Sequence, residues 1–158
     1  VGLTIAVHDT AEVIEAVETG HADLGVTGAT VRGARVQFEQ AGVDELVLIC
    51  PPSSPLASGK GVALADLADE RWVLRESGSG TRQVAERLAA DHGLDPDELR
   101  VTVELGTGEA IVSAVEGGLG ISIVSRYVAA KALELGTVRE VDAIGLPATR
   151  PFISRKPR

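Results

Sequence analysis

The residues best suited to bind a ligand lie in one loop, residues 75–82, whose sequence is Arg-Glu-Ser-Gly-Ser-Gly-Thr-Arg. Its glycines let backbone N–H groups turn inward, its hydroxyl groups add hydrogen-bond donors, and the start of the following helix adds positive potential. A tight turn before a well-capped helix is the structural alternative, in which Arg82 pairs with Glu86 one turn further on. The combination predicts an anion-binding site built from Ser77, Gly78, Ser79, Gly80, Thr81 and Arg82.

The same loop lacks the spacing of the two common nucleotide-binding motifs. No Gly-Lys-Ser or Gly-Lys-Thr follows it, as a P-loop requires. Gln83 stands where a dinucleotide-binding fingerprint needs its third glycine. The sequence therefore predicts no cofactor.

Three further points along the chain carry similar polar residues. Residues 9–10 and 106–108 each follow an apolar run and precede a helical pattern, and residues 27–28 end a third apolar run. Helix capping alone is the alternative explanation at the first two points, and an ordinary turn at the third. In an open α/β sheet, ligands bind at the carboxyl ends of the strands, so these residues are candidates to line one crevice with the loop: Thr10, Thr27, Gly28 and Thr107.

Residues for catalysis or metal binding are not grouped in the sequence. Ser79 lies in Ser-Gly-Ser-Gly-Thr, which is not the Gly-x-Ser-x-Gly elbow of a serine nucleophile. His8 and Asp9 are adjacent, and adjacent residues of a strand point to opposite faces, so they are not a predicted dyad. The other histidines are scattered and Cys50 is the single cysteine. The sequence therefore predicts no catalytic residue, no metal ligand and no enzymatic activity.

The composition disfavours several kinds of partner. The chain has 158 residues, 15 of them basic and 23 acidic, and its net charge of −8 disfavours non-specific binding to nucleic acid or to an anionic membrane. Hydrophobic residues make up 44% of the chain, yet no apolar run approaches the roughly 20 residues that cross a bilayer. We expect a soluble chain that forms one domain or one two-lobed unit.

Apolar runs typical of strands alternate with helical patterns along most of the chain. Short crossovers between apolar strands predict parallel sheets. The proline-rich residues 51–55 are expected to form a stiff crossing between two lobes. Helices are expected to begin after Asp9, at Ser79, after Thr107 and after Ser125. Strands are expected at residues 1–7, 23–27, 46–50, 72–75, 101–105 and 119–124, with weaker ones near 138–141 and 151–154.

Several ordered segments together resemble the effector-binding domain of LysR-type transcriptional regulators. They are residues 23–28 (Asp-Leu-Gly-Val-Thr-Gly), 44–57 (from Asp-Glu-Leu-Val to Pro-Leu-Ala), 64–67 (Leu-Ala-Asp-Leu), 104–111 and 118–126. Residues 72–82, from Trp-Val-Leu-Arg to Ser-Gly-Thr-Arg, look like the branch typified by regulators of sulfur assimilation and carbon fixation. Each segment is short, but the ordered set covers nearly the whole chain.

The resemblance implies a two-lobed α/β fold similar to type 2 periplasmic binding proteins. Each lobe would be a mostly parallel sheet flanked by helices, with the effector in the cleft between the lobes. Residues 1–50 and 126–158 would form lobe I, and residues 51–125 would form lobe II. Family members contact their effectors at the positions that correspond to Thr10, Thr27, Ser77, Ser79, Thr81 and Thr107. The family's winged helix-turn-helix, linker helix, first strand-loop-helix of the sensing domain and closing helix have no counterpart in these residues.

The function expected from this resemblance is ligand sensing by a cytoplasmic transcription factor. The domain would bind a small anionic metabolite and change the geometry of a homodimer or tetramer. DNA would be bound only through a winged helix-turn-helix absent from this chain, and no membrane partner is expected. A solute-binding protein of a transporter, with the same fold, is the alternative, disfavoured by the lack of an export signal. An enzyme on this scaffold and a chain that only dimerises are two further hypotheses.

Overall fold

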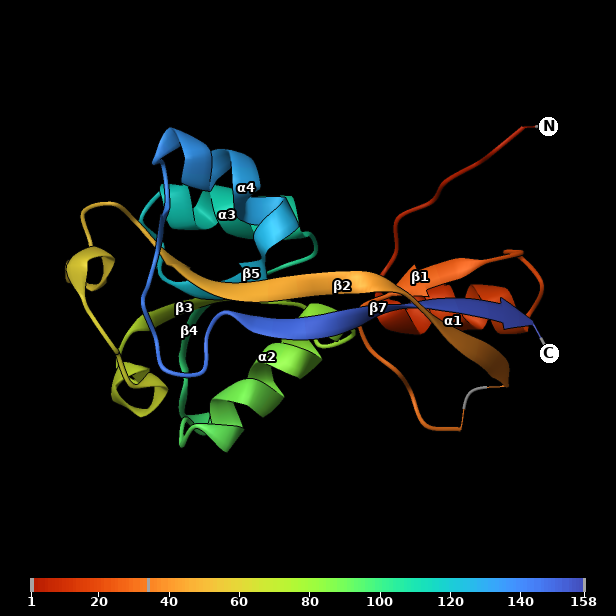
Figure 1. The fold of residues 1–158 in the computed structure, drawn as a ribbon, viewed down its shortest axis with the longest axis horizontal. Helices are drawn as coiled ribbons and strands as arrows, with labels where there is room; N and C mark the ends of the chain where they lie inside the picture. The colour runs from red at the N-terminus through yellow and green to blue at the C-terminus, as the bar shows by residue number, and fades with distance from the viewer. Residues whose placement is uncertain (1, 34, 158) are drawn as a thin grey trace.

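Two long antiparallel strands, β2 (Val36–Cys50) and β7 (Ala148–Pro157), form the centre of the molecule. The structure, a computed structural model, describes residues 2–33 and 35–157. The two strands pair from Val36 opposite Pro157 to Leu46 opposite Ala148. In Figure 1 they connect a small group of elements, near both chain ends, to a larger group at the opposite end of the molecule.

The other strands extend this sheet and form a second, smaller one. The large sheet has the order β1-β7-β2-β5, with β6 also paired to β2, and β3 and β4 form a two-stranded sheet. No helix among the described residues has the length and apolar character needed to cross a bilayer. The strands are β1 (Gly25–Thr27), β3 (Arg71–Arg75), β4 (Arg100–Leu105), β5 (Ser122–Ser125) and β6 (Arg139–Glu140). The helices are α1 (Thr10–Glu18), α2 (Gly80–Asp91), α3 (Gly108–Glu116) and α4 (Arg126–Leu135), with short 3-10 helices η1 (Pro55–Ser58), η2 (Leu64–Leu67) and η3 (Pro96–Glu98).

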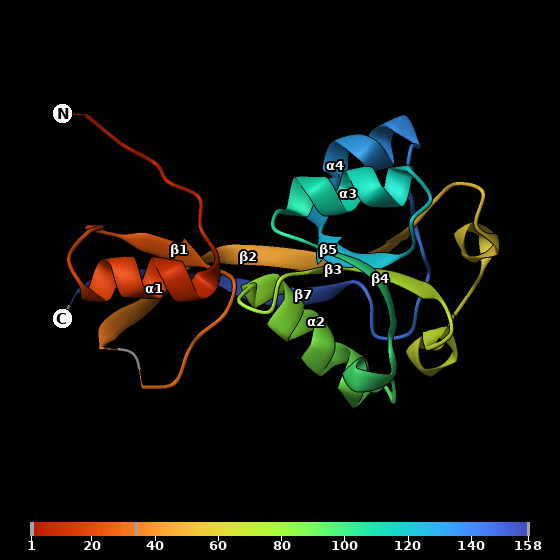
Figure 2. The same ribbon diagram turned by 180° about the vertical axis from the view of Figure 1, so that it is seen from behind.

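The small end of the molecule holds helix α1 and strand β1. The Asp9 carboxylate accepts the backbone N–H of Glu12, and the Glu12 carboxylate accepts the N–H of Asp9, so the predicted helix start after Asp9 is confirmed as a capping box. The apolar stripe of α1 buries Ile14 and Val17, and the helix contacts both β1 and β7. Figures 1 and 2 show from both sides that the two chain termini also lie at this end.

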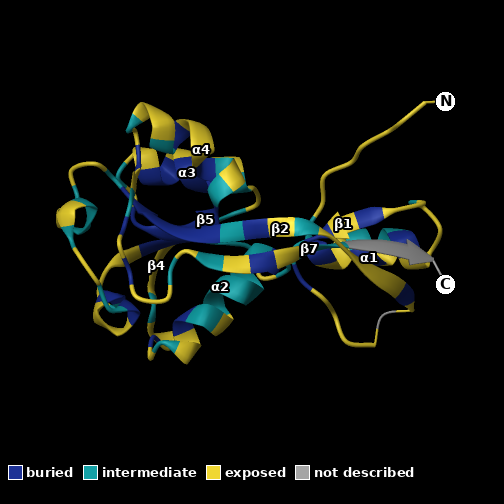
Figure 3. Cartoon of the chain, in the orientation of Figure 1, coloured by how far each residue is buried: buried dark blue, intermediate teal, exposed yellow. Residues whose placement is uncertain are grey.

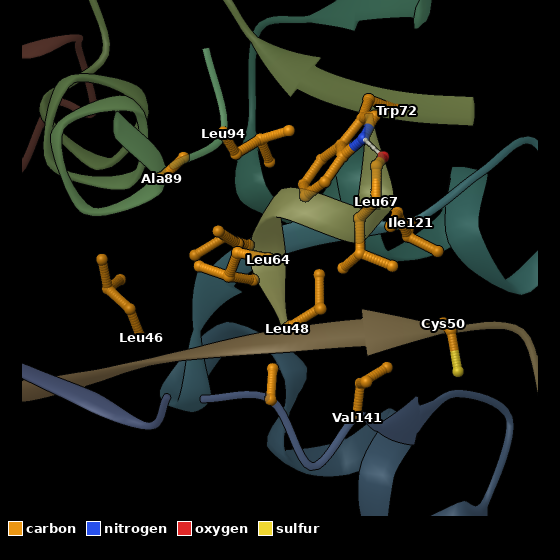
Figure 4. Close-up of a cluster of buried hydrophobic side chains, with 12 residues drawn as sticks. Leu46, Leu48, Cys50, Leu64, Leu67, Trp72, Ala89, Leu94, Ile121 and Val141 are labelled. Carbon is orange, nitrogen blue, oxygen red and sulfur yellow. Dashed lines mark hydrogen bonds between the residues drawn. The ribbon is translucent and has the colours of Figure 1, made fainter. Parts of the chain in front are cut away.

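The larger end contains two hydrophobic cores on opposite faces of β2. Successive strand residues point to opposite faces, so Leu46, Leu48 and Cys50 enter one core and the two residues between them enter the other. Figure 3 shows this stretch of β2 buried, and Figure 4 shows the first core around Trp72, whose indole N–H donates to the Leu67 carbonyl oxygen. The predicted strand at residues 46–50, covered on both faces, is confirmed.

Helices cover both faces of the larger end, with α3 and α4 side by side on one face and α2 on the other (Figures 1 and 2). Ile111 and Val115 of α3 share a core with Ala129 of α4. The predicted division places α4 in lobe I, with residues 1–50, and α3 in lobe II. Leu48 and Leu56, on either side of the proline-rich stretch, also belong to one core, so this stretch does not connect the two ends.

The strand directions differ in part from the expected mostly parallel sheets. Strands β3 and β4 pair in parallel, and a parallel bridge joins Trp72 of β3 to Ile121 next to β5. The described pairs of the five-stranded sheet, in contrast, are antiparallel. One reason is that β7 returns antiparallel along residues 36–46 of β2, a long-range pairing that the short crossovers in the sequence do not reveal.

The strand predicted at residues 1–7 is wrong for the described residues 2–7, which form no regular structure. Their alternating apolar side chains Leu3, Ile5 and Val7 are 84%, 77% and 88% exposed. A strand needs a neighbour to satisfy its backbone N–H and C=O groups, and no described strand pairs with this segment. The period-two pattern is present, but among residues 2–33 and 35–157 no strand pairs with it.

Candidate functional site

A cleft of about 520 Å³ is lined by the first turns of four helices. Helices α1, α2, α3 and α4 all begin at this cleft, although they come from distant parts of the sequence. Backbone N–H groups at a helix start have no partner within the helix and carry partial positive charge. The lining residues are Val7, His8, Asp9, Glu12, Arg75, Glu76, Thr81, Gly106, Thr107, Gly108, Glu109, Val124, Ser125 and Val128.

Local capping residues fix the start of three of these helices. Besides Asp9 at α1, the Ser79 hydroxyl accepts the N–H of Arg82 at 3.2 Å, and the Thr107 hydroxyl accepts the N–H of Ala110 at 3.1 Å. The predicted helix starts at Ser79 and after Thr107 are confirmed. At these helices a side chain already uses one of the free N–H groups.

The fourth helix, α4, begins differently. Ser125 occupies the predicted N-cap position, but its side chain makes no bond to the helix. Its hydroxyl instead donates to Oδ1 of Asp44 at 2.8 Å. The first N–H groups of α4 therefore have no side-chain cap, while Ser125 remains part of the cleft lining.

A buried ion pair lies behind the cleft, at the point where β2 and β7 connect the two ends of the molecule. Asp44 and Arg150 face each other in the register of these strands, and their side chains are 0% and 7% exposed. Nε and Nη2 of Arg150 both donate to Oδ2 of Asp44, at 3.0 and 2.9 Å. Nη2 also donates to the Thr81 hydroxyl oxygen at 3.0 Å. The pair thus holds Thr81, the cleft residue of α2. Through Ser125 it also holds the start of α4.

The third guanidinium nitrogen of Arg150, Nη1, is buried and has no hydrogen-bond partner in the part of the chain that the structure describes. It lies against Gly28, where an added Cβ would be 2.5 Å from Nη1. The backbone of residue 28 can approach the guanidinium this closely because glycine has no side chain. Gly28 is therefore adjacent to the ion pair, not to the open cleft.

Carboxylates also line the cleft, and most of them have local partners. Arg75 donates to both oxygens of Glu76, at 2.9 and 2.8 Å. These hydrogen bonds lower the pKa of Glu76, against the opposing effect of its burial. Glu12 accepts the N–H of Asp9 and lies 3.5 Å from His8. The cleft thus contains fixed acceptor oxygens as well as helix N-termini.

The structure distributes the predicted site residues over several environments. Thr81 and Thr107 line the cleft. Thr10, Thr27 and Ser79 are buried; the Thr27 hydroxyl donates to the Ala29 carbonyl. Gly78 and Gly80 allow the two ends of the molecule to approach each other closely. A Cβ at Gly78 would collide with Asp9, and a Cβ at Gly80 would collide with Thr10. Ser77 is exposed in the turn before α2.

Arg82 forms an ion pair with Glu86, as predicted by the alternative in which the loop is only a tight turn before a capped helix. Its guanidinium lies 2.7 Å from Glu86 and 2.9 Å from Glu104, and it donates to the Arg75 carbonyl at 2.8 Å. Burial alone would lower the pKa of Arg82, but its hydrogen bonds to the two carboxylates raise it. The side chain lines a small separate cavity under α2 and does not line the cleft. The geometry does not bring Arg82 to the same site as Thr81.

Three residues of this arrangement were absent from the predicted site: Asp44, Ser125 and Arg150. Ser125 was expected only to cap a helix, and Asp44 and Arg150 lie 106 residues apart. The sequence signal for them is weak, since an acidic and a basic residue on two distant strands have no characteristic spacing. The described residues contain no group of three or more His, Cys, Asp or Glu side chains placed to hold a metal ion.

Comparison with known proteins gives a consistent result. The model of the LysR substrate binding domain family matches residues 1–153. The chain is 34% identical to the RuBisCO operon transcriptional regulator of Allochromatium vinosum, over 96% of the chain and 49% of that protein. It is 39% identical to the uncharacterized HTH-type transcriptional regulator YeiE of Escherichia coli K12, over 92% of the chain and 48% of that protein. The chain thus spans about half the length of these relatives.

Among solved structures, the chain is similar to the regulatory domain of CcmR from Synechocystis PCC6803 in complex with 2-PG. The TM-score is 0.83 at 26% sequence identity, and the match covers 94% of this chain and 70% of that one. The predicted two-lobed fold class, with helices flanking β-sheets, is confirmed by this similarity. The predicted family resemblance is confirmed as well.

Proposed function

Because this chain belongs to the LysR substrate-binding domain family, we propose that it is the ligand-sensing part of a transcriptional regulator and that a small anionic metabolite binds in its cleft. Two relatives are transcriptional regulators, and the similar CcmR domain was solved with 2-PG. We assign the cleft a role in binding and not in catalysis, in keeping with the regulatory function of these relatives.

The observation that carries this proposal is the convergence of four helix starts on one cleft. Each helix N-terminus is equivalent to a partial charge of about +0.5. The start of α4 adds N–H groups without a side-chain cap, and the Thr81 hydroxyl adds a donor next to the buried guanidinium of Arg150. These groups act locally, so an anion is stabilised there although the chain has a net charge of −8.

We propose that the two ends of the molecule are the two lobes, divided within strands β2 and β7. Residues 9–42 with 151–157 would form lobe I, and residues 44–149 would form lobe II. The cleft takes its lining from α1 on one side and from α2, α3 and α4 on the other. A ligand that contacts both sides would bind more tightly to a closed arrangement than to an open one, and so would shift the equilibrium between them.

We propose that the wider partners are those of the family. The protein would act in the cytoplasm as a homodimer or tetramer and would bind DNA through a winged helix-turn-helix outside these residues. A solute-binding protein of a transporter is the alternative. The genomic sequence upstream separates the two, because a helix-turn-helix supports the regulator and an export signal supports the transporter.

Titration calorimetry with sulfate, phosphate and malate tests the proposed binding site. We expect at least one of these anions to bind, and Thr81→Ala to weaken that binding by about 1.5–3 kcal/mol, because it removes a charge-assisted hydrogen bond. Thr102→Ala is the matched control, since Thr102 is exposed on β4 and does not line the cleft. The proposal is contradicted if none of the three anions binds, or if Thr81→Ala and Thr102→Ala bind equally well.

A further inference from the structure

We propose that the buried Asp44–Arg150 pair fixes the hydroxyl orientations of Thr81 and Ser125, so that the cleft prefers an anion carrying a hydroxyl group to the same anion without one. This inference rests on the proposed function and narrows its ligand to hydroxy acids and related hydroxylated anions. It depends on the direction of each hydrogen bond in the chain of contacts from Thr81 to Ser125.

The Thr81 hydroxyl is held as a donor toward the ligand. A guanidinium has only donors, so in its 3.0 Å bond to Arg150 the Thr81 oxygen must accept. The hydroxyl proton of Thr81 therefore points away from Arg150. Because Thr81 lines the cleft, this proton is available to an anionic oxygen bound there.

The Ser125 hydroxyl is held in the opposite sense. An aspartate carboxylate bound by a guanidinium offers only acceptor oxygens, so in its 2.8 Å bond to Oδ1 of Asp44 the Ser125 hydroxyl must donate. Its proton is thereby used, and only its lone pairs remain for a ligand. Ser125 also lines the cleft, so it presents an acceptor there.

The ion pair prevents these two hydroxyl groups from reorienting. Both of its side chains are almost completely buried, so water cannot readily replace its bonds, and three of the bonds involve the same guanidinium. Glu76 adds further acceptor oxygens to the cleft, and its hydrogen bonds with Arg75 keep it ionised. A ligand with acceptor oxygens alone would satisfy Thr81 and the helix starts but would place an oxygen opposite Ser125 or Glu76. A hydroxyl group on the ligand donates to these acceptors instead.

Matched pairs of probes test this preference by titration calorimetry on the chain. Malate and succinate differ by one hydroxyl group, and 2-hydroxyethyl phosphate and ethyl phosphate form a second such pair. We expect the hydroxylated member of each pair to bind about tenfold more tightly. Its hydroxyl group makes one additional hydrogen bond, whereas the member without it leaves an acceptor of the cleft without a donor. Ser125→Ala should reduce this ratio to near one while the affinity for succinate changes little. Ser113→Ala, on the exposed face of α3, should keep the ratio.

The outcomes distinguish this inference from the proposed function. If hydroxylated and unhydroxylated probes bind equally well, or if Ser125→Ala keeps the ratio, the inference is wrong while anion binding stands. If none of the four probes, sulfate or phosphate binds, the proposed function is wrong and the inference fails with it. The paired variant Asp44→Leu/Arg150→Met provides a second test should Ser125→Ala not fold. It frees both hydroxyl groups to rotate, so it should also bring the ratio near one.

Discussion

Replacing Arg150 with methionine should destabilise the protein far more than replacing Arg150 and Asp44 together. Arg150→Met removes the two bonds to Asp44 and the bond to Thr81, and leaves a fully buried carboxylate with the Ser125 hydroxyl as its donor. Breaking a buried ion pair in this way costs about 3–5 kcal/mol. Because domains have a total stability of about 5–15 kcal/mol, the single variant should lose roughly a fifth of its stability or more.

The double variant Asp44→Leu/Arg150→Met should recover most of this loss. Two apolar side chains of similar combined volume remove both desolvated charges, and such replacements are about neutral or stabilising. They also remove Nη1 of Arg150, a buried donor without a partner among the described residues, which itself costs about 1–3 kcal/mol. We expect the double variant to lie within about 1–2 kcal/mol of the wild type.

Urea unfolding followed by tryptophan fluorescence measures both effects. Trp72 is the only tryptophan and is 2% exposed in the core shown in Figure 4, so its emission reports on unfolding of the larger end of the molecule. For a chain of this size, a loss of 3–5 kcal/mol corresponds to a decrease in Tm of roughly 6–20 °C. A loss of less than about 1 kcal/mol in Arg150→Met would refute the idea that the pair is a tightly coupled buried unit.

Three smaller changes have equally specific expected results. Ser79→Ala should cost about 1 kcal/mol of stability in urea unfolding, because it removes the cap bond of α2, and an unchanged stability would show that the cap is not needed. Gly120→Ala should cost roughly 1–3 kcal/mol, because the new Cβ would lie 2.8 Å from the Arg71 carbonyl carbon; full stability would mean that β3 can shift. Glu76→Gln should cost less than about 1 kcal/mol at pH 7. Because the folded-state pKa of Glu76 is lowered by Arg75, the stabilisation is present above the unfolded-state pKa of about 4.3 and is lost as the pH falls through the folded-state value. The stability difference between wild type and Glu76→Gln should therefore close below about pH 4, and a difference that grows in acid would contradict this sign.

The helix starts could be predicted from the sequence because capping is local. Asp9, Ser79 and Thr107 bond to backbone groups three residues away, and that spacing is visible in the sequence. The strand at residues 46–50 was also predictable, since an unbroken apolar run is typical of a strand buried on both faces. The starts of α2 and α3 also follow strands β3 and β4, as the sequence predicts.

The rest of the site depends on contacts between distant residues. Asp44 meets Arg150 only because β7 pairs antiparallel with β2 over a long stretch, and that register is not encoded by either strand alone. Ser125 has the residue type and position of a helix cap, but the buried Asp44 carboxylate takes its hydroxyl. Arg82 shows the reverse case, because its pairing with Glu86 is local and follows from the spacing of four residues along one helix.

The central claim is that a small anion binds where the four helices begin, and amide chemical shifts in a titration of the isotope-labelled chain test it most directly. With malate as the probe, we expect the largest shifts at the backbone N–H groups of residues 10–12, 80–82, 108–110 and 126–128, with the amides of β4 and η3 unchanged. Shifts confined to other parts of the chain, or no shifts at millimolar malate, phosphate and sulfate, would contradict the account.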